Sequence, residues 1–257
     1  MIKFFRHTRQ RMIKENRVSK YLLYGIGEIV LVVIGIMIAL QINNWNEDRS
    51  ERKEEKEYIS SLIEDLTTDT DRYTFLIDHF ALKEARIDVI LDSYLSLSEG
   101  YDHELYSSLH EVINYPDFIY TDKTMKQLMN AGGMRLIRDK EVASAIIDYD
   151  SAVRRLTESL MPDLNFYYRH SNEMWFEVMD IAAYEADTAL LSIIEMENGN
   201  KNYLLRSDKE TLGKWNNVIR NFQSDLILIR EVKEELNAKA TRLIELLNRK
   251  YDLDTNA

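Results

Sequence analysis

The chain has 257 residues, 45% of them hydrophobic and 30% charged, a composition typical of a folded protein of one or two domains. It contains no cysteine, which excludes disulfides, cysteine nucleophiles and cysteine-ligated zinc sites. With only eight glycines and two prolines, the composition favours long helices over sheets.

The net charge of −11 is unevenly distributed along the chain. Residues 1–20 carry seven basic side chains and one acidic side chain, so the remaining residues carry a net charge of −17. Such an acidic remainder is unsuited to nucleic acid, and we expect no nucleic-acid partner. The basic residues 1–20 instead suit anionic lipid headgroups, either as a cytoplasmic tail or as a short interfacial helix.

Residues 21–43 are predicted to form a transmembrane helix. The run from Tyr21 to Ile42 contains a single charge, Glu28, and would span roughly 33 Å as a helix. A cleaved signal peptide is the alternative, but the run is longer than a typical signal-peptide core and no cleavage pattern follows it. The positive-inside rule places the N-terminus in the cytoplasm and residues 44–257 in the periplasm, with the anchor in the inner membrane.

One stripe of the predicted membrane helix combines small residues with its only charge. Its members recur at helical spacing and are Gly25, Glu28, Val32, Gly35 and Ala39. Because small residues let helices approach closely, we interpret this stripe as a self-association face that gives a homo-oligomer. A single helix whose Glu28 reaches the headgroup region is the alternative.

Two segments resemble a known family. They are KFFRHTRQRMIKENRVSKYLLYGIGEIVLVVIGIMIALQINNWNE at 3–47 and TDKTMKQLMNAGGMRLIRDKEVASAIIDYD at 121–150. Both are similar to an uncharacterised Bacteroidota family of single-pass membrane proteins, the domain of unknown function 6090. The resemblance implies a membrane location and a helical extracytoplasmic domain, and it supplies no activity and no site.

Heptad patterns predict a long helix at each end of residues 44–257. The first follows Ile59, Leu62, Leu66, Asp69, Tyr73, Leu76, Phe80, Lys83, Ile87, Ile90, Tyr94 and Leu97. The second follows Leu212, Trp215, Ile219, Phe222, Leu226, Ile229, Lys233, Leu236, Ala240, Leu243 and Leu247, and Ser207 with Glu210 forms a predicted capping box before it. These helices either pair antiparallel within one chain or form a homo-oligomeric coiled coil.

Shorter helices are expected between the two long ones. Helices are predicted at 103–115 and 121–130, and the glycines after the second suit a left-handed helix end. Asp139 is expected to cap a further helix that stops at Pro162, and residues 163–196 give one or two more. The predicted fold class is therefore all-α, with a transmembrane helix continuing into an extended helical bundle.

Catalytic and metal motifs are missing from the sequence. There is no HExxH, Walker A, GxSxG or dinucleotide-binding glycine pattern, and no Glu-x-x-His pair of the di-iron type. His103 and His110 lie seven residues apart, and we expect them to be surface histidines. We therefore predict a protein that is not an enzyme and that holds no metal or cofactor.

Aromatic side chains are frequent in the middle of the chain. Tyr149, Tyr167, Tyr168 and Trp175 are candidates for an interaction surface, while packing of the helical core is the alternative. The leading functional hypothesis is a membrane-anchored interaction or scaffold protein with an unidentified protein partner. The alternative is a periplasmic helical-bundle sensor that signals through a separate partner.

Overall fold

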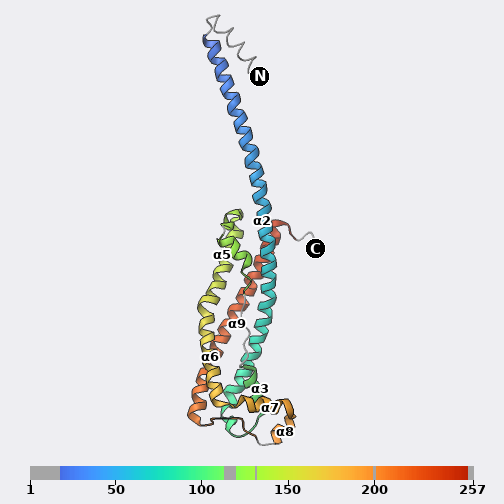
Figure 1. Ribbon diagram of the computed structural model, residues 1–257, viewed down its shortest axis with the longest axis vertical. Helices are drawn as coiled ribbons and strands as arrows, with labels where there is room; N and C mark the ends of the chain where they lie inside the picture. Colours follow the sequence, from blue (N-terminus) through green and yellow to red (C-terminus); the bar gives the residue numbers. More distant parts are fainter. Residues whose placement is uncertain (1–17, 113–119, 131, 199–200, 254–257) are drawn as a thin grey trace. The chain divides into compact units, whose positions relative to one another are not determined.

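A computed structural model describes residues 18–112, 120–130, 132–198 and 201–253. The described residues are helical apart from short connections and one isolated bridge between Met179 and Leu204, which confirms the all-α prediction. The chain divides into two compact units, residues 1–57 and 58–257. Figure 1 shows the course of the chain through both.

Helix α2 extends from Val18 to Ser93. Neither glycine nor proline occurs between Gly35 and Gly100, so no residue of the sequence forces an earlier helix end. The helix passes residue 43, where the predicted membrane segment ends, without a break. Its last residue is followed by the 3₁₀ turn η1, Tyr94–Ser98, and then by Gly100 with φ of 143°.

The second unit is built around an antiparallel pair made of α2 from Tyr58 onward and α9, Lys209–Tyr251. Three cross-helix hydrogen bonds set the direction: Asp88 pairs with Gln223 at 2.7 Å, Glu84 with Arg230 at 2.6 Å and Thr74 with Asn237 at 3.4 Å. The long helices thus pair within one chain, which is the first of the two predicted arrangements.

A third long segment packs along α9 and completes the bundle (Figure 1). It consists of α5, Lys140–Arg155, the π turn η3, Leu156–Leu160, and α6, Met161–Val178. The predicted helix end at Pro162 is wrong. Pro162 occupies the first turn of α6, where a missing backbone N–H costs little, and the preceding π turn accommodates the proline ring.

The core follows the predicted heptads. Every position of both patterns from Ile59 to Leu97 and from Leu212 to Leu247 is buried, except Tyr94, which packs partly buried against the core. Burying such a side chain contributes about 1.5–3 kcal/mol relative to exposing it. The amphipathic pattern is therefore the main reason why these segments pack as a bundle.

Short helices flank the bundle: α3, His103–Val112; α4, Lys123–Asn130; η2, Gly133–Leu136; α7, Ile181–Leu190; and α8, Ile193–Asn198. Gly132 has φ of 71°, as the predicted left-handed helix end requires. Pro116 lies outside the described residues. Helices α3, α7 and α8 gather where α9 begins, and we call this end of the bundle the far end (Figure 1).

Two predicted caps have different outcomes. Asp139 caps α5 by accepting hydrogen bonds from the backbone N–H groups of Glu141 and Val142, as expected. The capping box at Ser207 is wrong by one residue, because Asp208 caps α9 and accepts from the Thr211 N–H at 2.9 Å. An aspartate satisfies the free N–H groups of a first helical turn as well as a serine does.

Candidate functional site

From Leu22 onward the apolar run of α2 is exposed in the single chain, apart from the half-buried Gly25. One helix among the described residues is long and apolar enough to cross a membrane, and none of its most apolar window is buried. In the predicted association face, Val32 has 54% of its surface exposed, and Gly35, Ala39 and Glu28 are exposed as well. A Cβ added at Gly25 or Gly35 would meet no atom within 4 Å. The face is therefore open for close approach by another helix.

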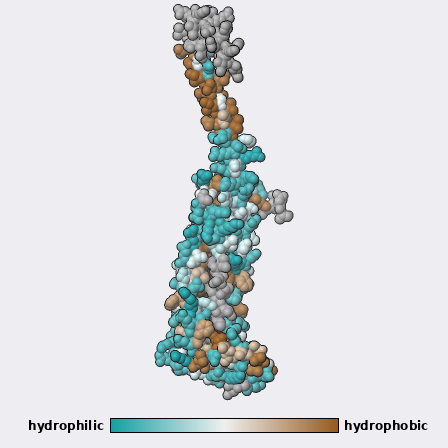
Figure 2. Space-filling model, viewed as in Figure 1, coloured by the Kyte–Doolittle hydropathy of each residue, from teal (hydrophilic) through white to brown (hydrophobic). Residues whose placement is uncertain are grey.

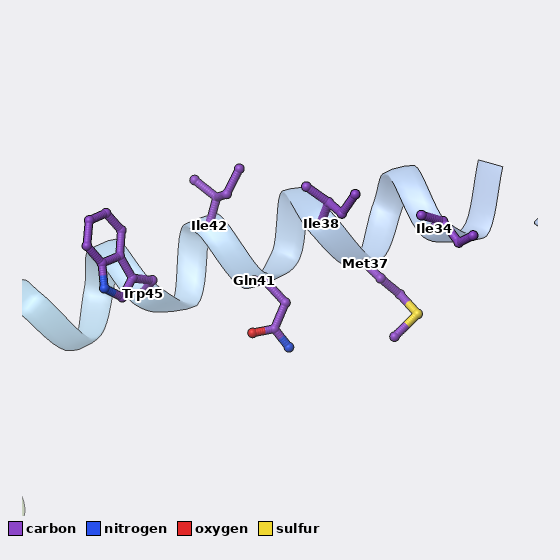
Figure 3. Close-up of a pocket in the computed structure, with 6 residues that line it drawn as sticks. All are labelled: Ile34, Met37, Ile38, Gln41, Ile42 and Trp45. Atoms are coloured by element: carbon purple, nitrogen blue, oxygen red, sulfur yellow. The ribbon is translucent and has the colours of Figure 1, made fainter. Parts of the chain in front are cut away.

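A second face of the same run is shown in Figure 3. A shallow hollow is lined here by Ile34, Met37, Ile38, Gln41, Ile42 and Trp45, all from α2 itself. At 3.6 residues per turn this face is centred roughly 130° around the helix from the association face. The two faces share no residue, so substitutions can address them separately.

The four candidate aromatics do not form one surface. Tyr149 and Trp175 are buried in the core, where Trp175 stacks on Trp215 with ring centroids 5.2 Å apart. Tyr167 and Tyr168 are half-buried, and the Tyr168 ring lies 5.9 Å from that of Phe222. These positions match the alternative of core packing more closely than that of a shared interaction surface.

A buried polar network surrounds Asp69 of α2. Its carboxylate accepts the Thr121 N–H at 3.0 Å and lies 3.5 Å from the Tyr149 hydroxyl, which in turn lies 3.3 Å from the Tyr73 hydroxyl. Burial raises the pKa of Asp69 and of both tyrosines. One helical turn earlier, Asp65 accepts the N–H of Thr124 in the first turn of α4. The two aspartates thus fasten the start of α4 to α2.

Lys83 of α2 fastens α3 to α2. Its buried ammonium donates to the backbone oxygens of Glu111 and Val112, at 2.7 and 3.3 Å, at the C-terminal end of α3. A cation is favourable there because the last carbonyls of a helix carry partial negative charge. Arg86 adds an ion pair with the Glu111 carboxylate at 2.9 Å. Burial still lowers the pKa of Lys83 to about 8.

A second lysine lies inside the bundle. Lys233 of α9 has none of its surface exposed, and its ammonium nitrogen lies 5.5 Å from the centroid of the Phe80 ring. Burial lowers the pKa of Lys233 to about 7. Asp69, Lys83 and Lys233 are the three charged residues of the predicted heptads. The heptad pattern identifies them as charged residues at otherwise apolar positions, but it does not predict which groups they contact.

Four tyrosines pack together at the far end. Among Tyr101, Tyr106, Tyr184 and Tyr203, five of the six ring pairs have centroids 5.2 to 5.9 Å apart. The Tyr203 hydroxyl donates to Asp187 at 2.9 Å, and Lys201 forms an ion pair with the same carboxylate. These hydrogen bonds lower the pKa of Asp187. The cluster holds α3, α7 and the chain before α9 together.

The two candidate histidines take part in this packing. The Tyr101 hydroxyl lies 3.1 Å from His103 Nδ1, and the His110 ring lies 6.0 Å from that of Tyr184. Both histidines are half-buried, so the expectation of freely exposed side chains is only partly met. Across the described part of the chain, no group of three or more histidine, aspartate or glutamate residues is placed to hold a metal ion.

These features define an all-α protein in which one helix suited to a membrane is joined to a helical bundle. The chain belongs to a family of unknown function, DUF6090, whose model matches residues 28–158. That match covers the apolar run from Glu28 onward, the Asp69 network and α5. No curated protein and no solved structure matches the chain.

Proposed function

We propose that the protein is a membrane-anchored, non-enzymatic interaction protein that self-associates through α2. The observation that carries this proposal is the open face of Gly25, Val32, Gly35 and Ala39 on an apolar helix. In lipid, helix association depends on close packing, which small residues permit. Identical helices can then pair through the same face, as symmetric oligomers do.

The charge distribution supports an inner-membrane location with the N-terminus in the cytoplasm. Basic residues before an apolar run are retained on the cytoplasmic side, and residues 1–20 carry a charge of +6. The helical bundle would then lie in the periplasm. A protease added to intact spheroplasts should digest the bundle and leave an epitope at the N-terminus protected. An N-terminal epitope lost without permeabilisation would reverse this orientation.

Native mass spectrometry of the full-length protein, released in a gentle detergent, tests the assembly directly. We expect a homo-oligomer of defined size, because the association face is continuous over about four helical turns. A protein that remains monomeric across several detergents and in lipid nanodiscs would contradict self-association.

Gly35→Leu should abolish or shift this oligomer, because the leucine side chain would occupy the space that a close-packed partner helix needs. Gly27→Leu is the matched control, since Gly27 lies about 80° around the helix from Gly35 and also has open space at its Cβ. Equal mass distributions for the two variants would show that the Gly35 face takes no part in assembly.

A sensor module is the second candidate function, and the π turn η3 favours it. Such turns within a helix often occur at functional sites, and η3 lies in the middle of the long segment packed on α9. A ligand that shifts α5 against α6 would stabilise the bundle. A broad thermal-shift screen of the full-length protein that yields no stabilising compound would count against a ligand sensor.

A further inference from the structure

Three large apolar side chains are exposed together at the far end. Leu190 closes α7 with 82% of its surface exposed, and Ile193 and Ile194 open α8 with 47% and 69% exposed. We call these three residues the α7–α8 patch. Figure 2 shows hydrophobic side chains on the surface at this end of the domain. Single exposed apolar residues are common, whereas a contiguous group marks an interaction site more often.

The local structure at the start of α8 helps to explain why these side chains are exposed. Ser192 and Glu195 form a capping box, because the Glu195 carboxylate accepts the Ser192 N–H at 2.8 Å and the Ser192 hydroxyl faces the Glu195 N–H at 3.4 Å. Leu191 and Met196, on either side of the box, pack against the core. Ile194 lies about 160° around α8 from the buried Met196 and therefore points outward, while Ile193 lies about 60° from Met196 and keeps 47% of its surface exposed. The exposure of Ile194 is therefore a consequence of the helix start at Ser192.

The segment of sequence that contains the patch is strongly acidic. The thirty residues from Ser171 to Asn200 contain seven acidic side chains and no lysine or arginine. Glu185, Glu195 and Glu197, on the same two helices as the patch, are all exposed. Lys201, which follows this segment, is engaged in its ion pair with Asp187. The patch thus combines exposed leucine and isoleucine with three exposed glutamates on the same two helices, and we call these glutamates its rim.

This combination selects one class of occupant. Anionic lipid would be repelled by the rim, and a second copy docking patch to patch would bring like charges together. A helix with leucine-type residues on one face and lysine or arginine beside them would match both the apolar and the charged parts. We propose that the α7–α8 patch is a docking surface for a cationic amphipathic segment of a partner protein. This proposal rests on the proposed interaction function and names its partner class.

The test uses the full-length protein in phosphatidylcholine nanodiscs and a fluorescent amphipathic helical peptide made of leucine and lysine. Anisotropy should report binding above that of empty discs, and the affinity should fall with added salt because the rim contributes electrostatically. The double variant Leu190→Ser/Ile194→Ser should bind at least about tenfold more weakly, since hot-spot side chains at the centre of an interface carry most of its affinity. Hydrogen exchange should show protection by the peptide at 185–198.

The matched control is Leu82→Ser/Leu228→Ser, which removes two exposed leucines from the bundle helices α2 and α9. Its affinity should equal that of the wild type. Equal affinity of the patch and control variants would overturn the proposal, as would equally tight binding of a peptide with glutamate in place of lysine. Patch-dependent dimerisation of the protein itself would also overturn it. Gly35→Leu should still bind the peptide. Peptide binding and self-association through α2 are then independent results, so that either proposal can fail while the other holds.

Discussion

Asp69→Ala should lower the free energy of unfolding by about 3 kcal/mol, because hydrogen bonds to a buried carboxylate contribute strongly and their loss strands buried donors. The Thr121 N–H and the Tyr149 hydroxyl would both lose their acceptor. Denaturant titration of the full-length protein in detergent, followed by tryptophan fluorescence, measures the change through the stacked pair of Trp175 and Trp215.

Two further variants make this test specific. Asp69→Asn should cost less, about 1 kcal/mol, because burial raises the pKa of Asp69, so that the site needs an acceptor oxygen more than a charge. Asp71→Ala removes an exposed carboxylate two residues away and should change stability by less than about 0.5 kcal/mol. If Asp69→Ala unfolds at the same denaturant concentration as Asp71→Ala, the network does not stabilise the fold.

The long helices were predictable because their burial pattern has a short period. A heptad is read within a few turns, and it correctly placed both seams and the charged exceptions within them. The partners of the exceptions were not predictable, because they lie far along the chain. Asp69 binds Thr121, 52 residues later, and Lys83 binds the end of α3, 28 residues later. Asp69 and Lys83 each lie where a short helix joins the bundle, whereas Lys233 lies beside the Phe80 ring within it.

Local stop signals were less reliable than periodicity. Pro162 reads as a helix end, but a π turn lets α5 continue into α6, and tertiary packing on α9 stabilises the continuous segment. Ser207 and Asp208 are both good caps, and sequence alone does not choose between neighbours.

Among the candidate sites, the one on a single helix was predictable from the sequence, and those that depend on contacts between helices were not. The α2 face was defined residue by residue, because a lone helix fixes which side chains share a stripe. The sequence could not distinguish buried from half-buried aromatic candidates, because burial depends on neighbours from other helices. Tyr149 and Trp175 are buried, while Tyr167 is half-buried. The α7–α8 patch escaped notice because LLSIIEME resembles a core segment. The helix start at Ser192 and the packing of Leu191 and Met196 on the core together decide which of its apolar side chains turn outward.

Lys233→Met should raise the free energy of unfolding by on the order of 2 to 3 kcal/mol at pH 7, because a buried ammonium loses its hydration on folding. The Phe80 ring lies 5.5 Å from the ammonium, and burial lowers the pKa of Lys233 to about 7. Methionine fills a similar volume and has no charge to desolvate. The same denaturant titration measures the difference from wild type.

The pH dependence distinguishes this explanation from better packing alone. The folded pKa of Lys233, about 7, is below the unfolded value of 10.5, so between these pH values the unfolded chain binds a proton that the folded chain does not. The contribution of Lys233 to the free energy of unfolding of the wild type therefore falls as the pH decreases from about 10.5 to about 7. The fall is at most about 1.4 kcal/mol per pH unit. Lys233→Met should remove the pH dependence of stability that Lys233 causes, and a smaller dependence of the same sign should remain from Lys83. The gain in stability of Lys233→Met over the wild type should therefore shrink from pH 7 to pH 9.5. Lys214→Met, at an exposed position of α9, should leave the slope unchanged. A Lys233→Met advantage that stays constant across this range would show that the ammonium is not desolvated in the folded protein.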